Sequence, residues 1–148
     1  MRRIERHARI AAPPPELFAY LADLDNLSEW QSGVLSARRT SSGEMGVGTT
    51  ASVVRGMMGQ QIEAPLTVTE HAPPHRLVIS SEVSGIGAVA SLDLAPAEDG
   101  EATDLTFAME IRGSGATGFM VPMIASAAAG DVDSSLERLK ARFNLPPD

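Results

Sequence analysis

The chain has 148 residues, of which 43% are hydrophobic, and its formal net charge is −7. No apolar stretch approaches the roughly 20 residues of a membrane span, so we expect one cytoplasmic domain over residues 1–148 with no transmembrane segment. The lack of cysteine excludes disulfides and thiolate chemistry, and the negative charge argues against nucleic acid as a partner.

The N-terminal part predicts a strand followed by two short helices. Apolar and polar residues alternate over residues 3–10, which is the pattern of a half-buried strand. Prolines 13–15 and Glu16 then suit the first turn of a helix. A second short helical piece is expected to end near Trp30.

The central part, from Val34 to Arg112, predicts six consecutive strands separated by turn-forming residues. Apolar and polar residues alternate clearly from Ile62 onward, as in an antiparallel sheet with one solvated face. The expected apolar face comprises Ile62, Ala64, Leu66, Val68, Leu77, Ile79, Val83, Ala90, Leu92, Leu94, Leu105, Phe107, Met109 and Ile111.

The last segment predicts a helix of about seven turns that covers the sheet. Its expected apolar stripe contains Val121, Ala125, Ala128, Val132, Ser135, Leu139 and Phe143. Further apolar side chains lie off this stripe near its start, which a simple surface helix would not have. These are Phe119, Met120, Met123 and Ile124.

The order of these elements resembles the START-like superfamily, also called SRPBCC, and within it the polyketide cyclase/dehydrase-like family. The residues that carry the resemblance are 10–13 before Leu17 and Phe18, 22–25 before 29–31, 46–49, 66–70 before 73–77, and Leu136, Leu139 and Lys140. The resemblance implies an α+β helix-grip fold, in which a curved seven-stranded antiparallel sheet, two short helices and a long C-terminal helix enclose a cavity. It implies no single activity, because such folds serve as carriers, sensors and enzymes.

The connections between the strands divide into a polar set and a glycine-rich, apolar set at opposite ends of the sheet. The second set, residues 56–59, 84–87 and 113–118, predicts a mouth that opens over a hydrophobic guest. The alternative is that these are ordinary hairpin tips packed back on the sheet. The candidate ligand-binding residues are Trp30, Met57, Met58, Ile86, Phe107, Met109, Phe119, Met120, Met123 and Ile124.

Two sequence motifs resemble a dinucleotide site and a metal site but lack the surroundings that such sites need. Residues 113–118 spell G-x-G-x-x-G between a strand and a helix, but a dinucleotide site needs a further parallel strand that the sequence does not provide. His71 and His75 are separated by Pro73 and Pro74, which prevent a helix that would align both imidazoles. We therefore expect neither a metal nor a cofactor.

Three functional hypotheses remain. The first is a carrier or sensor of a small hydrophobic molecule such as a lipid, polyketide or aromatic metabolite, because the expected inner face has few ionisable groups. The second is a cyclase/dehydratase of the kind the resemblance implies, for which Arg6, Glu70 and Tyr20 are the catalytic candidates. The third is an interaction module that uses the apolar start of the last helix, with a homodimer left open.

Overall fold

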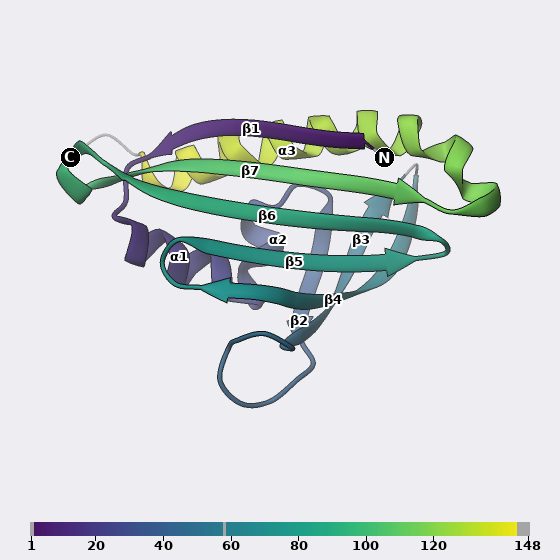
Figure 1. The fold of residues 1–148 in the computed structure, drawn as a ribbon, viewed down its shortest axis with the longest axis horizontal. Coiled ribbons are helices and arrows are strands. Elements are labelled where there is room, and N and C mark those ends of the chain that lie inside the picture. Colours follow the sequence, from purple (N-terminus) through teal and green to yellow (C-terminus); the bar gives the residue numbers. More distant parts are fainter. Residues whose placement is uncertain (1, 58, 145–148) are drawn as a thin grey trace.

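The computed structural model describes residues 2–57 and 59–144, apart from the side chain of Met57. It contains seven strands, two short α-helices, one long α-helix and three 3₁₀ turns within these residues (Figure 1). The elements are β1 (Arg2–Ile10), α1 (Pro14–Ala22), η1 (Leu24–Asn26), α2 (Leu27–Trp30), β2 (Val34–Arg39), β3 (Thr50–Met57), β4 (Gln60–Ala72), β5 (Arg76–Val83), β6 (Ile86–Ala97), η2 (Glu98–Gly100), β7 (Ala102–Gly113), η3 (Gly115–Met120) and α3 (Val121–Phe143).

The strands form one antiparallel sheet in the order β1-β7-β6-β5-β4-β3-β2. The six central strands are a simple meander, and β1 joins it by pairing with the last strand. The sheet is strongly curved, so that β2 and β3 lie behind β4 and β5, while α3 runs behind β1 and β7 (Figure 1). The α+β helix-grip arrangement expected from the sequence is therefore confirmed.

The face of the sheet that is turned toward α3, which we call the inner face, carries the predicted apolar residues. Leu66, Val68 and Leu77 are at most 6% exposed, and so are Leu105 and Phe107 on β7. The ring of Trp30 meets that of Phe107 edge to face, with 5.9 Å between the centroids. This pair fills the middle of the interior with aromatic surface.

A β-bulge between Val68 and Glu70 changes the alternation on β4. The sequence pattern places Glu70 on the inner face beside Val68, but the extra residue in the bulge turns it to the outer face. There its carboxylate lies 2.9 Å from the guanidinium of Arg76. The expected inward orientation of Glu70 is therefore wrong.

The long helix α3 begins at Val121, so Phe119 and Met120, which the sequence assigns to the first half of this helix, lie in η3 instead. The helix also buries a slightly different stripe. Ile124 and Leu136 join the buried set, whereas Ala128 and Phe143 are only half-buried. Within the described residues, no helix is both long and apolar enough to cross a membrane.

Gly113, at the junction of β7 and η3, allows two segments to approach closely. A Cβ atom at this position would lie 2.7 Å from Val121 Cγ2 and 2.9 Å from the carbonyl oxygen of Thr117. The Thr117 hydroxyl also donates to the Gly85 carbonyl at 3.1 Å, so η3 is tied to the β5–β6 hairpin. The glycine serves close packing here and does not act as a hinge.

We predict that Gly113→Ala lowers the free energy of unfolding by about 1–3 kcal/mol, because the added methyl group overpacks a rigid junction. Urea unfolding followed by circular dichroism measures the change. Gly118→Ala is the matched control, since a Cβ atom there meets nothing within 4 Å. Equal stability of the two variants would contradict the packing role of Gly113.

Candidate functional site

Burial of the inner face falls steadily toward one end of the sheet. On β6, Leu92 and Leu94 are 3% and 4% exposed, whereas Ala90, Ala88 and Ile86 are only half-buried. The same change occurs on β5 from Leu77 to Val83, on β4 from Val68 to Ile62, and on β3 from Val53 to Arg55. Solvent therefore reaches the inner face at the end formed by Gly56, Gly59, residues 84–87 and residues 113–118, which we call the glycine rim.

The positions of the helices explain this gradient. Helix α3 packs mainly against β1 and β7, and there Met109 and Ile111 stay buried almost to the end of the strand. Helix α1 covers the opposite end of the interior, where Phe18 lies edge to face with His71 at 5.5 Å. The inner face of β3–β6 near the glycine rim receives less cover from either helix.

Arg55 is the charged residue that lies on this half-covered part of the inner face. It follows Ala51 and Val53 in the alternation of β3 and pairs with Val34 on β2 and Ile62 on β4. Burial lowers the pKa of the Arg55 guanidinium, and the attraction of Asp131 opposes this shift. Arg55 forms no salt bridge within 4.0 Å among the described residues, so its charge is poorly compensated.

Asp131 faces the same region from α3. Its carboxylate lies over Gly33, where a Cβ atom would be only 3.0 Å from Asp131 Oδ2. Burial raises the pKa of Asp131, while the charge of Arg55 and a hydrogen bond with the Ser32 side chain lower it. Ser135 anchors this part of the helix by accepting from the Ser32 amide at 2.8 Å and donating to the Asp131 carbonyl at 2.6 Å.

Trp30 supplies an unused hydrogen-bond donor to the interior. The residue is 2% exposed, and its Nε1 atom has no hydrogen-bond partner among the described residues. A buried indole N–H normally finds an acceptor, because leaving it unpaired costs about 1–3 kcal/mol. An oxygen atom of a bound molecule would satisfy it.

The sequence names Trp30 as a candidate for this region, but neither Arg55 nor Asp131 is among the residues predicted from it. The signal for Arg55 was present, because Ala51 and Val53 set the inward parity of β3 and Arg55 continues it. Asp131 carried no such signal, since helical spacing placed it beside the expected stripe. Its approach to the interior depends on the missing side chain of Gly33, which only the folded chain brings near.

The other predicted ligand-binding residues divide into an inner and an outer group. Phe107, Met109 and Ile124 are buried on the interior side, while Ile86 and Met120 are half-buried at the glycine rim. Met58 and the side chain of Met57 lie outside the described residues.

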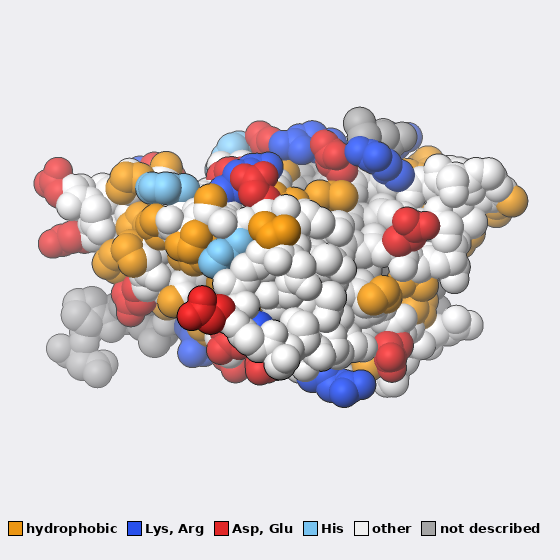
Figure 2. Space-filling view, turned by 60° about the horizontal axis from the view of Figure 1, so that its bottom comes forward, with side chains coloured by type: hydrophobic (Ala, Val, Ile, Leu, Met, Phe, Trp, Pro, Cys, Tyr) orange, Lys and Arg blue, Asp and Glu red, His pale blue; other side chains and the backbone are white. Residues whose placement is uncertain are grey.

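Phe119 and Met123 differ from the expected cavity lining because they are 79% and 51% exposed. Phe119 lies in η3, which packs against Gly113 and the β5–β6 hairpin, and Met123 lies in the first turn of α3. Hydrophobic side chains come to the surface at the right-hand end of Figure 2, where η3 and the start of α3 lie. The exposure of this pair fits a contact surface better than a cavity wall.

The expected catalytic candidates lie outside the interior. Arg6 donates from Nε to Asp133 at 3.0 Å on the edge of the sheet, with 43% of its side chain exposed. The Tyr20 hydroxyl donates to Glu29 at 3.1 Å, and burial is the main cause that raises the pKa of Tyr20 to about 12. Together with Glu70 on the outer face, these residues are structural ion-pair and hydrogen-bond partners.

In the part of the chain that the structure describes, no three His, Asp or Glu side chains gather to hold a metal ion. The G-x-G-x-x-G segment is an internally bonded turn, in which the Ser114 amide donates to Thr117 Oγ1 at 3.1 Å. The chain runs from this turn into α3 and not into a βαβ unit.

Comparison with known proteins decides the family. The sequence matches the family described as "Polyketide cyclase / dehydrase and lipid transport" over residues 1–144. The chain belongs to this family. A search of curated proteins gives no sequence match, so the family assignment rests on this match over nearly the whole chain.

Several solved structures share the fold of this chain. A START superfamily protein from Mycobacterium smegmatis aligns with a TM-score of 0.79 and 11% identity, over 96% of this chain and 97% of that chain. The Zhui aromatase/cyclase from Streptomyces sp. R1128 aligns with a TM-score of 0.77 and 13% identity, over 95% and 92%. A protein from Thermus thermophilus aligns with a TM-score of 0.77 and 19% identity, over 95% and 96%. At these identities the likeness shows the fold alone.

The raised pKa of Asp131 predicts a distinct pH dependence of stability. The folded state holds the proton more tightly than the unfolded chain, so ionised Asp131 opposes folding as the pH rises through the raised pKa. We expect the stability of Asp131→Asn relative to the wild type to increase between pH 3.5 and pH 7. Urea unfolding across this pH range measures the difference.

Asp104→Asn is the control, because its stability relative to the wild type is expected to change with pH in the opposite direction. A hydrogen bond from Arg9 is the main cause that lowers the pKa of Asp104, so its ionisation favours folding above its ordinary pKa. Asp104→Asn is therefore expected to lose stability relative to the wild type over the same rise in pH. A parallel response of the two variants would contradict the buried position of Asp131.

Proposed function

We propose that this member of the family binds a small hydrophobic molecule with an anionic or oxygen-bearing end, as a carrier or sensor. The body of the molecule contacts the half-buried apolar residues at the glycine rim, and its polar end contacts Arg55. The observation that carries this proposal is Arg55, which has no salt bridge within 4.0 Å among the described residues and lies at the half-buried end of the inner face.

The chemistry of the interior supports such a ligand. Residues such as Ile62, Val83 and Ile86 offer apolar surface, and each buried methylene group of a ligand contributes about 0.8 kcal/mol. Arg55 offers guanidinium donors that form strong bonds with carboxylate, phenolate or phosphate oxygens. The unpaired indole N–H of Trp30 offers one further donor deeper inside.

We predict that the protein binds 2-naphthoate and that Arg55→Met weakens this binding about tenfold or more, because a charge-assisted hydrogen bond contributes about 1.5–3 kcal/mol. Binding of 2-naphthalenemethanol, which has the same rings and no charge, is expected to change much less. Isothermal titration calorimetry measures both. The matched control is Arg38→Met, an exposed arginine on the outer side of β2.

Equal weakening by Arg55→Met and Arg38→Met would show that the overall charge and not the interior attracts the probe. Binding that is unaffected by Arg55→Met would refute the polar anchor. Native mass spectrometry of the protein purified from its own host then identifies the class of the natural ligand through any molecule that co-purifies.

A second candidate function is polyketide cyclisation or dehydration in the same interior. Arg55 and Asp131 favour it, because a guanidinium stabilises a developing enolate or alkoxide and a carboxyl group whose pKa is raised above its ordinary value holds a proton that it can donate. The structural likeness to an aromatase/cyclase supports the same idea at the level of fold.

The second candidate function, cyclisation or dehydration, has its own test. We expect a synthetic poly-β-keto thioester to be cyclised by the wild type and Asp131→Asn to lower kcat while leaving the binding of 2-naphthoate within about twofold of the wild type. High-resolution mass spectrometry of single-turnover products measures the reaction. A carrier or sensor without activity would bind the thioester and release it unchanged.

A further inference from the structure

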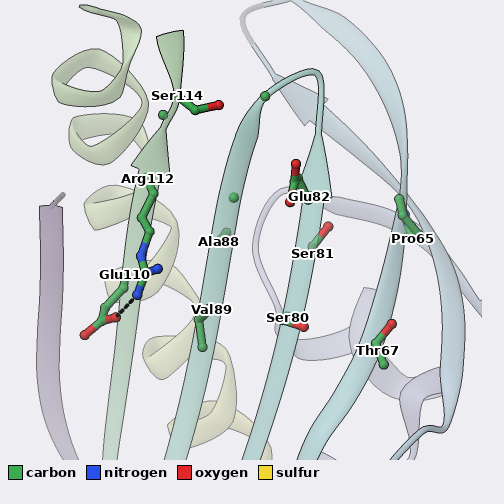
Figure 3. Close-up of a pocket in the computed structure, with 13 residues that line it drawn as sticks. Pro65, Thr67, Ser80, Ser81, Glu82, Ala88, Val89, Glu110, Arg112 and Ser114 are labelled. Carbon is green, nitrogen blue, oxygen red and sulfur yellow. Dashed lines mark ion pairs between the residues drawn. The ribbon is translucent and has the colours of Figure 1, made fainter. Parts of the chain in front are cut away.

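The outer face of the sheet carries a hollow of about 560 Å³ that is separate from the interior. Thr67, Ser80, Val89 and Glu110 lie in one row across β4, β5, β6 and β7. Their side chains line the hollow on the side of the sheet that faces away from α3 (Figure 3). Interior and hollow therefore occupy opposite faces of the same strands.

In the next row of residues on this outer face, Gly87 leaves a gap because it has no side chain. It pairs with Glu82 on β5 and with Arg112 on β7, so no side chain stands between these two residues. A glycine inside a ladder weakens the strand and commonly marks a place where another molecule approaches the backbone.

Nothing within the chain requires a glycine at position 87. Its φ is not in the left-handed region, and an added Cβ atom would meet only the Ser81 carbonyl oxygen, at 4.0 Å. This contrasts with Gly113, where the packing leaves no room for a Cβ atom. Gly87 therefore keeps open a space that the fold itself does not use.

The two walls of the gap carry opposite charges. Glu82 forms no salt bridge within 4.0 Å among the described residues, and the Arg112 side chain is 66% exposed. Arg112 lies 3.8 Å from Glu110, whose other carboxylate oxygen already accepts from Arg3 at 3.1 Å. Glu82 and Arg112 are two strands apart, roughly 9.5 Å along the sheet, so their side chains can contact the two ends of one small molecule.

We propose that this hollow binds a small zwitterion with an ammonium group and a carboxylate, of the amino acid or short peptide class. The ammonium group bonds to Glu82, the carboxylate bonds to Arg112, and the ligand backbone crosses Gly87. The Ser80 hydroxyl bonds to an amide group of the ligand, and Val89 contacts its methylene groups. A hollow of this volume lies within the range of small-molecule sites.

Titration of the nitrogen-15-labelled protein with glycylglycine, followed by NMR, tests the proposal. We expect saturable shifts of the Gly87 and Val89 amides, and binding of N-acetylglycine, which lacks the ammonium group, about tenfold weaker. Gly87→Val should abolish the shifts because its side chain fills the gap. Gly56→Val is the matched control, since Gly56 lies on the same face outside the hollow and a Cβ atom there meets only Leu35 Cδ1, at 3.9 Å.

Glu82→Gln and Arg112→Gln provide a second, less intrusive route, and each should weaken glycylglycine binding about tenfold. Absence of saturable shifts in the wild type, or equal shifts in wild type and a folded Gly87→Val, would overturn the proposal. Binding of 2-naphthoate should remain unchanged in Glu82→Gln and Arg112→Gln, which lie outside the glycine rim, and this separates failure of this site from failure of the interior site.

Discussion

One helix has to cover the apolar face of a seven-stranded sheet, and the rest of the structure follows from this constraint. Helix α3 has 23 residues and is about 34 Å long at 1.5 Å per residue, yet it lies mainly over β1 and β7. The short helices cover the other end of the interior. The inner face of β3–β6 near the glycine rim is left half-covered, and Arg55 is desolvated there without a close partner.

The connections of the glycine rim, although all rich in glycine, are not all free to move. The connection at residues 113–118 is fixed, because Thr117 bonds to the β5–β6 hairpin and Gly113 packs against Val121. The glycine rim is therefore closely packed on the side of β7. On β6, alternate residues serve different faces, with Ile86 and Ala88 turned inward and Gly87 opening the hollow on the outer side.

Period-two alternation predicted the sheet and its inner face because each antiparallel strand buries one side only. The same rule applied to β3 identifies Arg55, since it follows Ala51 and Val53. Glu70 could not be placed from sequence, because a bulge reverses the alternation without any signal in the residues themselves. The approach of Asp131 to the interior and the packing of η3 depend on contacts with Gly33 and at Gly113, which exist only once distant segments have packed together.

One measurement tests most directly the proposal that the half-covered inner face is a binding site. Intermolecular NMR contacts between bound 2-naphthoate and the methyl groups of the protein locate the aromatic rings. We expect contacts with Ile62, Val83 and Ile86, and a carboxylate orientation toward Arg55. Contacts confined to the outer face, or to the polar end of the sheet around Leu77 and Leu94, would contradict this picture of the interior.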